Sequence, residues 1–191
     1  MGKNRLEAFS DGVLAIILTI MVLELKAPHG DSFAALQALL PTFVGYALSF
    51  SYIAIYWNNH HHMLHAVKRV NGPILWANTH LLFWLSLVPF ATAWMGSNNF
   101  AARPVALYGF VLLMAALAYY LLSQSLIRHQ GEGSLLKKAV GEDFKGRASI
   151  AIYAAAILLS FASRWIGFGL YWVVALIWLV PDRRIERTLT D

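Results

Sequence analysis

Long apolar stretches, separated by short polar segments, make up most of the chain. Ser32 to Asn59, Asn71 to Ala102 and Pro104 to Ile127 contain no Asp, Glu, Lys or Arg. Each stretch is long enough to cross a bilayer as a helix, which needs about 20 residues at a rise of about 1.5 Å per residue. Two shorter apolar runs, Ala148 to Ser163 and Trp165 to Pro181, are separated by a single residue. This pattern predicts an all-α, polytopic membrane protein.

Together with the N-terminal segment, these stretches predict six transmembrane helices in one domain that covers residues 1–191. The expected spans are approximately residues 5–25, 33–60, 72–95, 104–127, 147–163 and 165–181. The last two spans are short, so we expect them to include flanking residues. No second copy of the N-terminal segment is apparent, which favours a single repeat without a soluble domain. Gly167 and Gly169 in the sixth span are expected to allow close contact between helices.

The composition supports a membrane protein and excludes several other classes. Of the 191 residues, 59% are hydrophobic and 13% are charged, whereas soluble domains contain about 25% charged residues. The chain contains no cysteine, which excludes disulfides and thiolate metal sites. We interpret the net charge of +5 as a bias of the loops rather than as a surface for nucleic acid, because the basic residues flank the spans.

The basic residues lie mostly on one side of the six expected spans. Twelve lysines and arginines fall on the side of the termini, and three, Lys26, Arg103 and Arg164, fall on the other side. The positive-inside rule therefore predicts that both termini are cytoplasmic. We expect a multi-pass protein of the cell (inner or plasma) membrane, whose surroundings are the lipid bilayer and which binds no nucleic acid.

The first expected span differs from the others in length and charge. Only 12 uncharged residues, Gly12 to Leu23, lie between Asp11 and Glu24. Such a run extends over roughly 18 Å, which is short of a hydrocarbon core about 30 Å thick. A lipid-facing helix of this kind would draw a carboxylate toward the bilayer, at a cost of ~2.5 kcal/mol or more at its centre. We therefore expect the first helix to lie inside the assembly, away from lipid.

The helical step of about 100° per residue divides the first helix into two faces. One narrow apolar stripe contains Ile16, Ile20 and Leu23, with Thr19 at its border and Phe9 and Gly12 on the N-terminal side. Asp11 lies almost opposite and is expected to point into the helix bundle. Periodicity leaves two interpretations open. The stripe either packs against neighbouring helices, as apolar stripes usually do, or lines a passage.

The N-terminal segment also contains a specific motif. Arg5-Leu6-Glu7-Ala8-Phe9-Ser10-Asp11 resembles the Arg-x-x-x-Phe-Ser-Asp signature of the bacterial relatives of the lysosomal potassium channel, transmembrane protein 175. Trp57-Asn58-Asn59-His60-His61 looks like the Trp-x-x-His-His of that family at the end of the second span. Asn78 and Pro89-Phe90 in the third span also match. The resemblance covers roughly residues 5–95, and the second half of the chain matches only in span count and polarity.

The resemblance implies a homotetramer in which four copies of the first helix surround a central pore. The hydrophobic constriction of the family would map onto Ile16, with Ile20 and Leu23 as further rings and Thr19 beside them. The usual filter sequence, Thr-Val-Gly-Tyr-Gly, is absent. A ring of isoleucines offers no oxygen to replace the hydration shell of an ion, so it gates by dewetting and favours the cation that loses water more readily. We therefore expect a potassium-permeable cation channel, weakly selective for potassium over sodium, with no cofactor and no metal other than permeating potassium.

A second group of residues is expected to hold the pore helix in place. This predicted structural network consists of Arg5, Phe9, Ser10, Asp11, Trp57, His60 and Asn78. Asp11 is the member that most needs a partner, because a buried carboxylate is costly unless it is paired. Its candidate partners are Arg5, Trp57, His60 and Asn78, all expected near the cytoplasmic ends of the first three spans. For Arg5, the role of an interfacial anchor is the alternative.

A proton-coupled small-molecule transporter that uses Asp11 and the histidines is the main alternative function. Such transporters usually contain inverted repeats or helices broken at the midplane. Neither is apparent here, although Pro41 could kink the second span. His61 and His65 share a helix face and could bind a metal, but the nearby sequence contains no carboxylate. An intramembrane enzyme would need a nucleophile or carboxylate beside the histidines, so the chain is not expected to be an enzyme.

Overall fold

The described part of the chain consists of α-helices and short connections. The structure is a computed structural model that describes residues 2–67, 69–131, 137 and 143–179. The helices are α1 (Asn4–Leu23), α2 (Phe33–Gln37), α3 (Leu40–His65), α4 (Gly72–Ser86), α5 (Val88–Ser97), α6 (Ala102–Gln130), α8 (Phe144–Ala162) and α9 (Arg164–Leu179). The predicted all-α class is thereby confirmed. Outside the described residues lie the expected end of the sixth span, Val180 and Pro181, and the basic residues Lys68, Lys138, Arg183, Arg184 and Arg187.

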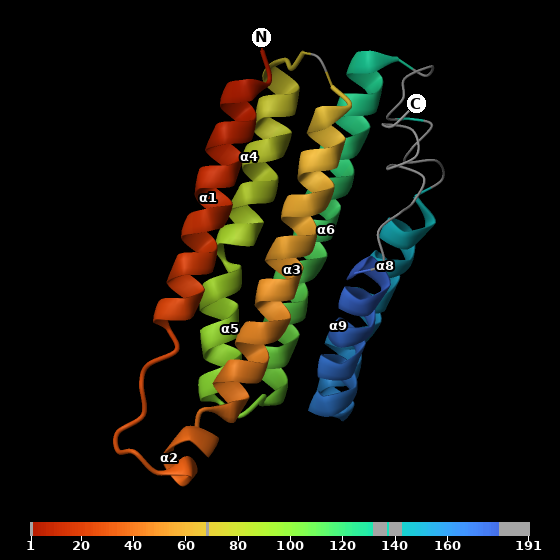
Figure 1. The fold of residues 1–191 in the computed structure, drawn as a ribbon. Coiled ribbons are helices and arrows are strands. Elements are labelled where there is room, and N and C mark those ends of the chain that lie inside the picture. The colour runs from red at the N-terminus through yellow and green to blue at the C-terminus, as the bar shows by residue number, and fades with distance from the viewer. Residues whose placement is uncertain (1, 68, 132–136, 138–142, 180–191) are drawn as a thin grey trace.

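The helices form one elongated bundle (Figure 1). α1, α3, α6 and the α4–α5 pair run side by side, and α8 and α9 form a hairpin on the side away from α1. α1 packs against α3, α4 and α5, whereas α6 packs against α4, α5, α8 and α9. α1 therefore lies at one edge of the subunit and the hairpin lies at the other. The N-terminus, the end of α3 and the end of α6 meet at the same end of the bundle (Figure 1).

Four of the described helical segments are long and apolar enough to cross a membrane. They are Asn4–Leu23, Gly72–Ser97, Ala102–Gln130 and Phe144–Ala162. α9 is apolar but has only 16 residues. α3 has 26 residues, but its serines, tyrosines, asparagines and histidines lower its mean hydropathy. Length and composition thus support four spans, and the expected count of six is not confirmed.

The third expected span consists of two helices. α4 ends at Ser86 and α5 begins at Val88, with Leu87 between them. Pro89 occupies the first turn of α5, where its missing N–H is tolerated because the first amides of a helix have no partner within that helix. Pro41 likewise stands in the first turn of α3. It therefore begins that helix and does not kink it.

The start of α1 is fastened to the end of α3. The Lys3 ammonium donates hydrogen bonds to the carbonyl oxygens of Leu64 at 2.9 Å and His65 at 3.3 Å. A cation at this position is favourable because the last carbonyls of a helix carry partial negative charge. Lys3 also lies 3.3 Å from the carboxylate of Glu7. These contacts fix where α1 enters the bundle.

Buried tyrosines attach the hairpin to the remaining helices. The Tyr52 hydroxyl of α3 donates to the Tyr171 carbonyl oxygen of α9 at 2.6 Å. The Tyr171 hydroxyl in turn donates to the Val105 carbonyl oxygen of α6 at 3.1 Å. Tyr52, Tyr108 and Tyr171 are among the largest fully buried side chains. Their hydroxyls therefore obtain the partners that buried polar groups require.

Two glycines permit close packing at the hairpin, Gly109 between α6 and α9 and Gly167 between α8 and α9. A Cβ atom at Gly109 would overlap the Tyr171 hydroxyl, and one at Gly167 would overlap the Ser160 hydroxyl. Gly167 therefore allows close helix contact, as the sequence predicted. No atom lies within 4 Å of a Cβ placed at Gly169, so that glycine is not needed for contact.

Gly109→Ala is expected to destabilise the subunit, because the added methyl group displaces Tyr171 from its bond to Val105. Overpacking of this kind costs about 1–3 kcal/mol. Gly169→Ala is the matched control, and it is expected to be neutral or stabilising because alanine favours a helix by about 1 kcal/mol over glycine. Thermal unfolding of both variants in detergent, followed by circular dichroism, measures the difference. Equal midpoints for the two variants would contradict this account of Gly109.

Candidate functional site

The apolar stripe of α1 is uncovered in the single chain. Ile16 is 60% exposed, Ile20 is 44% exposed and Leu23 is 71% exposed. Thr19 is also exposed, but its hydroxyl donates to the Ala15 carbonyl oxygen at 2.9 Å and is thus tied to its own helix. The buried face of α1 consists instead of Leu6, Ser10, Leu14, Ile17 and Met21. Within the subunit, the stripe is therefore not a packing surface.

A groove runs beside this stripe, between α1 and the α4–α5 pair. It has a volume of about 510 Å³ and is lined by Val13, Ile16, Ile17, Ile20 and Glu24 on one wall and by Ser86, Pro89, Phe90 and Ala93 on the other. The Phe90 side chain is 63% exposed. The exposed apolar surface of α1 therefore continues onto α5 and forms a face wider than one helix.

Behind the stripe, three buried polar side chains join three helices. Asn78 Nδ2 of α4 donates to Ser10 Oγ of α1 at 3.0 Å, and Asn78 Oδ1 lies 2.7 Å from His60 Nε2 of α3. Ser10 in turn donates to the Leu6 carbonyl oxygen at 2.8 Å. Because Oδ1 of an amide only accepts, this geometry requires a proton on His60 Nε2. Ser10 and Asn78 are fully buried and His60 is 3% exposed. These bonds therefore take the place of the hydrogen bonds that the three side chains would form with water.

Asp11 has a separate partner. Trp57 Nε1 of α3 donates to Asp11 Oδ1 at 3.0 Å, and both side chains are exposed. The carboxylate thus does not point into the bundle, in contrast to the expectation from periodicity, and it does not bond to Asn78. The physical reason is that α1 lies at the edge of the bundle, where only its Leu14 side is covered. Trp57 also stacks on His61, with 5.8 Å between the ring centroids.

Arg5 and Phe9 join neither set of contacts. Phe9 is 58% exposed and thus extends the uncovered apolar face of α1 toward the N-terminus. Arg5 is exposed as well, and it forms no ion pair or side-chain hydrogen bond within the residues that the structure describes. The structure therefore brings together five of the seven network residues, in two groups instead of one.

The histidines at the end of α3 do not form a metal site in the described residues. His61 and His65 stack with 6.2 Å between their ring centroids. No group of three His, Cys, Asp or Glu side chains with suitable geometry occurs among residues 2–67, 69–131, 137 and 143–179. His80 in α4 accepts a hydrogen bond from Trp84 Nε1 at 2.9 Å. Each of these imidazoles thus stacks on a neighbouring ring or accepts a hydrogen bond.

Sequence reasoning missed a second buried polar cluster near the break between α4 and α5. Ser49 Oγ lies 2.6 Å from Thr92 Oγ1 and 2.9 Å from the Tyr108 hydroxyl. Thr92 uses its own proton to donate to the Val88 carbonyl oxygen at 2.7 Å. Ser49 therefore donates to Thr92 and accepts from Tyr108, because each hydroxyl has one proton. The cluster connects α3 and α6 to Thr92 of α5, and no motif in the sequence indicated the pairing.

Comparison with known proteins places these residues in a family. Residues 5–89 match the profile of the endosomal/lysosomal potassium channel TMEM175. A protein from a Chryseobacterium species, named as a potassium channel, is 58% identical over 191 residues and aligns over 100% of both chains. The chain belongs to the TMEM175 family. The crystal structure of a lysosomal potassium-selective channel TMEM175 homologue from Chamaesiphon minutus superposes with a TM-score of 0.83 at 28% identity, covering 94% of this chain and 97% of that one.

The family resemblance predicted from the motifs is thus confirmed. The human endosomal/lysosomal proton channel TMEM175 is 29% identical in an alignment of 187 positions that covers 85% of this chain and 36% of the human protein. Every motif residue from Arg5 to Pro89 lies inside the range that matches the TMEM175 profile. These relatives are named as ion channels, in agreement with the prediction that the chain is not an enzyme.

Asn78→Ala is expected to destabilise this TMEM175-family subunit, since it leaves His60 and Ser10 buried without their partner. An unsatisfied buried polar group costs about 1–3 kcal/mol. Thr79→Ala changes the next residue of α4, which is exposed and bonds only to its own helix, so it is the matched control. Thermal unfolding in detergent measures both variants. If Asn78→Ala unfolds at the same temperature as Thr79→Ala, the buried bonds do not stabilise α1 in this way.

Proposed function

We propose that this chain is the subunit of a potassium-permeable cation channel. The Chryseobacterium relative is named as a potassium channel and the Chamaesiphon homologue as a potassium-selective channel. Four described segments can cross a membrane by length and composition. The observation that carries the proposal is the exposed apolar stripe of Ile16, Ile20 and Leu23 on α1. A hydrophobic constriction needs apolar side chains that the other helices of the same chain leave uncovered.

The proposed pore is surrounded by four copies of α1 in a homotetramer. α1 lies at the edge of the bundle. It exposes the Asp11 carboxylate on the side away from the stripe, and Glu24, directly after its last residue, is exposed as well. A carboxylate that faces hydrocarbon is costly, so water or a second protein surface is a better neighbour for this helix than lipid. The groove between α1 and α5 offers apolar surface on which an adjacent copy would pack.

Selectivity in this proposal arises from dehydration and not from coordination. Ile16 forms the narrowest ring, Ile20 and Leu23 form further rings, and the nearby Thr19 hydroxyl is engaged with Ala15. Without oxygen ligands, the constriction favours the cation that sheds water more easily, and the preference for potassium over sodium is weak. The human relative is named as a proton channel, so proton flux belongs among the measured currents. No cofactor is needed beyond the permeating potassium ions.

The structural network holds the pore helix from behind and from the side. Ser10, Asn78 and His60 fix its buried face, and Trp57 binds Asp11 at its flank. In this proposal Asp11 positions α1 and does not bind the permeating ion. Arg5 serves as an interfacial anchor at the start of the helix.

We also infer a position in the cell (inner or plasma) membrane with both termini in the cytoplasm. Lys3 bonds to the end of α3, Arg69 pairs with Gly2, and Arg128 lies in the last turn of α6. These helix ends meet at the end of the bundle that carries the N-terminus (Figure 1). Arg103 and Arg164 lie in the first turns of α6 and α9, which begin at the opposite end of the bundle. This distribution is the one that the positive-inside rule associates with cytoplasmic termini.

Ile16→Asn is expected to increase the current and to bring potassium and sodium permeability closer together, because a polar ring keeps the constriction wet. Val22→Asn makes the same kind of change on another exposed part of α1, where Val22 is 46% exposed, and it should have a smaller effect. Recording from the purified protein in planar bilayers, under potassium, sodium and proton gradients, provides the test. A saturable substrate flux without unitary currents would refute the channel.

Asp11→Ala is expected to lower the yield of assembled protein while leaving the ion preference of the remaining channels unchanged, because Trp57 loses its acceptor. Asp11→Asn retains an Oδ1 acceptor without the charge, so it should assemble like the parent protein. Size-exclusion chromatography with light scattering reports assembly, and bilayer recording reports preference. Normal assembly of Asp11→Ala with loss of cation preference would assign Asp11 to the ion pathway instead.

A further inference from the structure

A ridge of aromatic side chains lies on α3 beside the pore helix. It consists of Phe43, Tyr46 and Phe50, whose ring centroids follow one another at 6.2 Å and 6.0 Å. At about 100° per residue, all three point within about 40° of the direction of Trp57, and Trp57 bonds to Asp11 of α1. Phe43 and Phe50 are exposed, and Tyr46 between them is half-buried. The aromatic ridge is therefore an uncovered apolar surface next to α1.

The aromatic ridge and the groove flank the apolar stripe of α1 on opposite sides. Ile17, which lines the groove, points about 100° to one side of Ile16. Asp11, which meets Trp57 of α3, points about 140° to the other side. The first flank is hollow, with a groove volume of about 510 Å³, and the second flank carries the rings. The two flanks of one subunit are thus complementary in shape.

The aromatic ridge lies beside the outer half of α1, away from the N-terminus. α3 runs antiparallel to α1 (Figure 1), and the bond between Trp57 and Asp11 sets two positions level with each other. Phe50 comes seven residues before Trp57, and Leu18 comes seven residues after Asp11. Because both helices rise by about 1.5 Å per residue, Phe50 lies level with Leu18.

The wall of the groove reaches the same level. α4 runs parallel to α1 (Figure 1), and the bond between Asn78 and Ser10 sets these two helices in register. Ser86, which lines the groove, comes eight residues after Asn78, and Leu18 comes eight residues after Ser10. Ser86 is therefore level with Leu18 and hence with Phe50 of the aromatic ridge.

A pore lined by α1 needs protein in this groove. Ile16 and Ile20 belong both to the proposed pore stripe and to the wall of the groove. A groove filled by lipid would bring hydrocarbon tails to the edge of the water-filled pore and leave its wall open. In a ring of identical subunits, one flank of each copy faces the opposite flank of the next, which is a heterologous contact. Rotation about the pore axis does not change the level of a residue, so the ridge of one copy arrives beside the groove of its neighbour.

We propose that the aromatic ridge of each subunit packs into the groove of the next subunit around the pore. This inference rests on the proposed channel, and it names the surface of the second copy that closes the pore wall. Phe50 of one copy lies against the wall that contains Ile20 and Ser86 of the next. Aromatic rings suit this role because they fill a hollow with large apolar area at low cost in side-chain entropy.

Crosslinking of introduced cysteines tests this arrangement, and the chain has no native cysteine to interfere. Phe50→Cys places a thiol on the aromatic ridge, and Ser86→Cys places one on the wall of the groove. The two single variants, coexpressed and treated in the membrane with a short bis-methanethiosulfonate reagent, are expected to give a crosslinked dimer. A chain that carries both substitutions should give products up to the tetramer. Each single variant alone should stay uncrosslinked, because a heterologous contact does not bring ridge to ridge.

Leu158→Cys is the matched control, because it exposes a thiol on the hairpin at the other edge of the subunit. Coexpressed with Ser86→Cys, it should give no dimer. Equal crosslinking of this control pair, crosslinking of Phe50→Cys with itself, or no product from the Phe50→Cys and Ser86→Cys pair would overturn the proposal. Light scattering and bilayer recording on the same samples separate this result from the channel itself. A conducting tetramer without the expected product leaves the proposed channel standing, whereas a monomer without current would overturn both.

Phe50→Ala tests how much the aromatic ridge contributes to assembly. It is expected to shift the balance from tetramer to monomer by about tenfold or more, since truncation of a buried aromatic anchor usually costs that much affinity. Phe161→Ala removes an exposed ring from the hairpin and should leave the balance unchanged. Size-exclusion chromatography with light scattering over a dilution series in detergent measures both. Equal dissociation of the two variants would contradict the proposed contact.

Discussion

Asn78 joins three helices through a single amide group. Its backbone belongs to α4, its Nδ2 donates to Ser10 on α1, and its Oδ1 accepts from His60 on α3. All three side chains are buried, so any bond left unmade would leave a polar group without water or partner. This requirement permits one rotation of α1 about its own axis, because any other rotation would carry Ser10 away from Asn78. The direction of every other side chain on α1 follows from it.

With that rotation fixed, the faces of α1 have different surroundings. Leu14 and Ile17 pack into the bundle, Asp11 meets Trp57 at the flank, and Ile16 is left facing outward. The exposed stripe is thus not a by-product of loose packing. A carboxylate on one border of the exposed surface and an apolar stripe on the other are difficult to reconcile with lipid, and they are compatible with a helix that contacts other subunits and water.

The sequence predicted the features that depend on local pattern and missed those that depend on tertiary neighbours. Apolar runs predicted the helical class, and the 100° step separated Ile16 from Asp11. Periodicity does not reveal how much of a helix is covered, so Asp11 was expected inside the bundle and Ser10 was not recognised as the residue that bonds to Asn78. The pairing of Ser49 with Thr92 could not be predicted either, because single hydroxyl residues are common in apolar helices and only the fold brings these two together.

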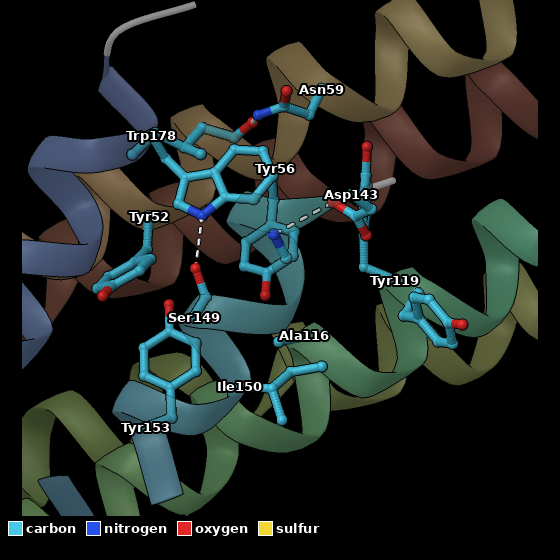
Figure 2. A pocket seen from close by; sticks show the side chains of 13 residues that line it. Tyr52, Tyr56, Asn59, Ala116, Tyr119, Asp143, Ser149, Ile150, Tyr153 and Trp178 are labelled. Carbon is cyan, nitrogen blue, oxygen red and sulfur yellow. Dashed lines mark hydrogen bonds between the residues drawn. The ribbon is translucent and has the colours of Figure 1, made fainter. Parts of the chain in front are cut away.

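The two edges of the subunit are connected through α3. Tyr56 lines a small cavity between α3, α6 and the α8–α9 hairpin (Figure 2), and the next residue, Trp57, donates a hydrogen bond to Asp11 of α1. Adjacent residues of a helix point about 100° apart, so one turn of α3 contacts both regions. Proximity alone does not couple them, because a ligand shifts an equilibrium only by its difference in affinity between two states. A change at the hairpin would reach the proposed pore helix only if α3 turns or shifts with it, and the Tyr52 bond to Tyr171 is a contact that joins α3 to α9.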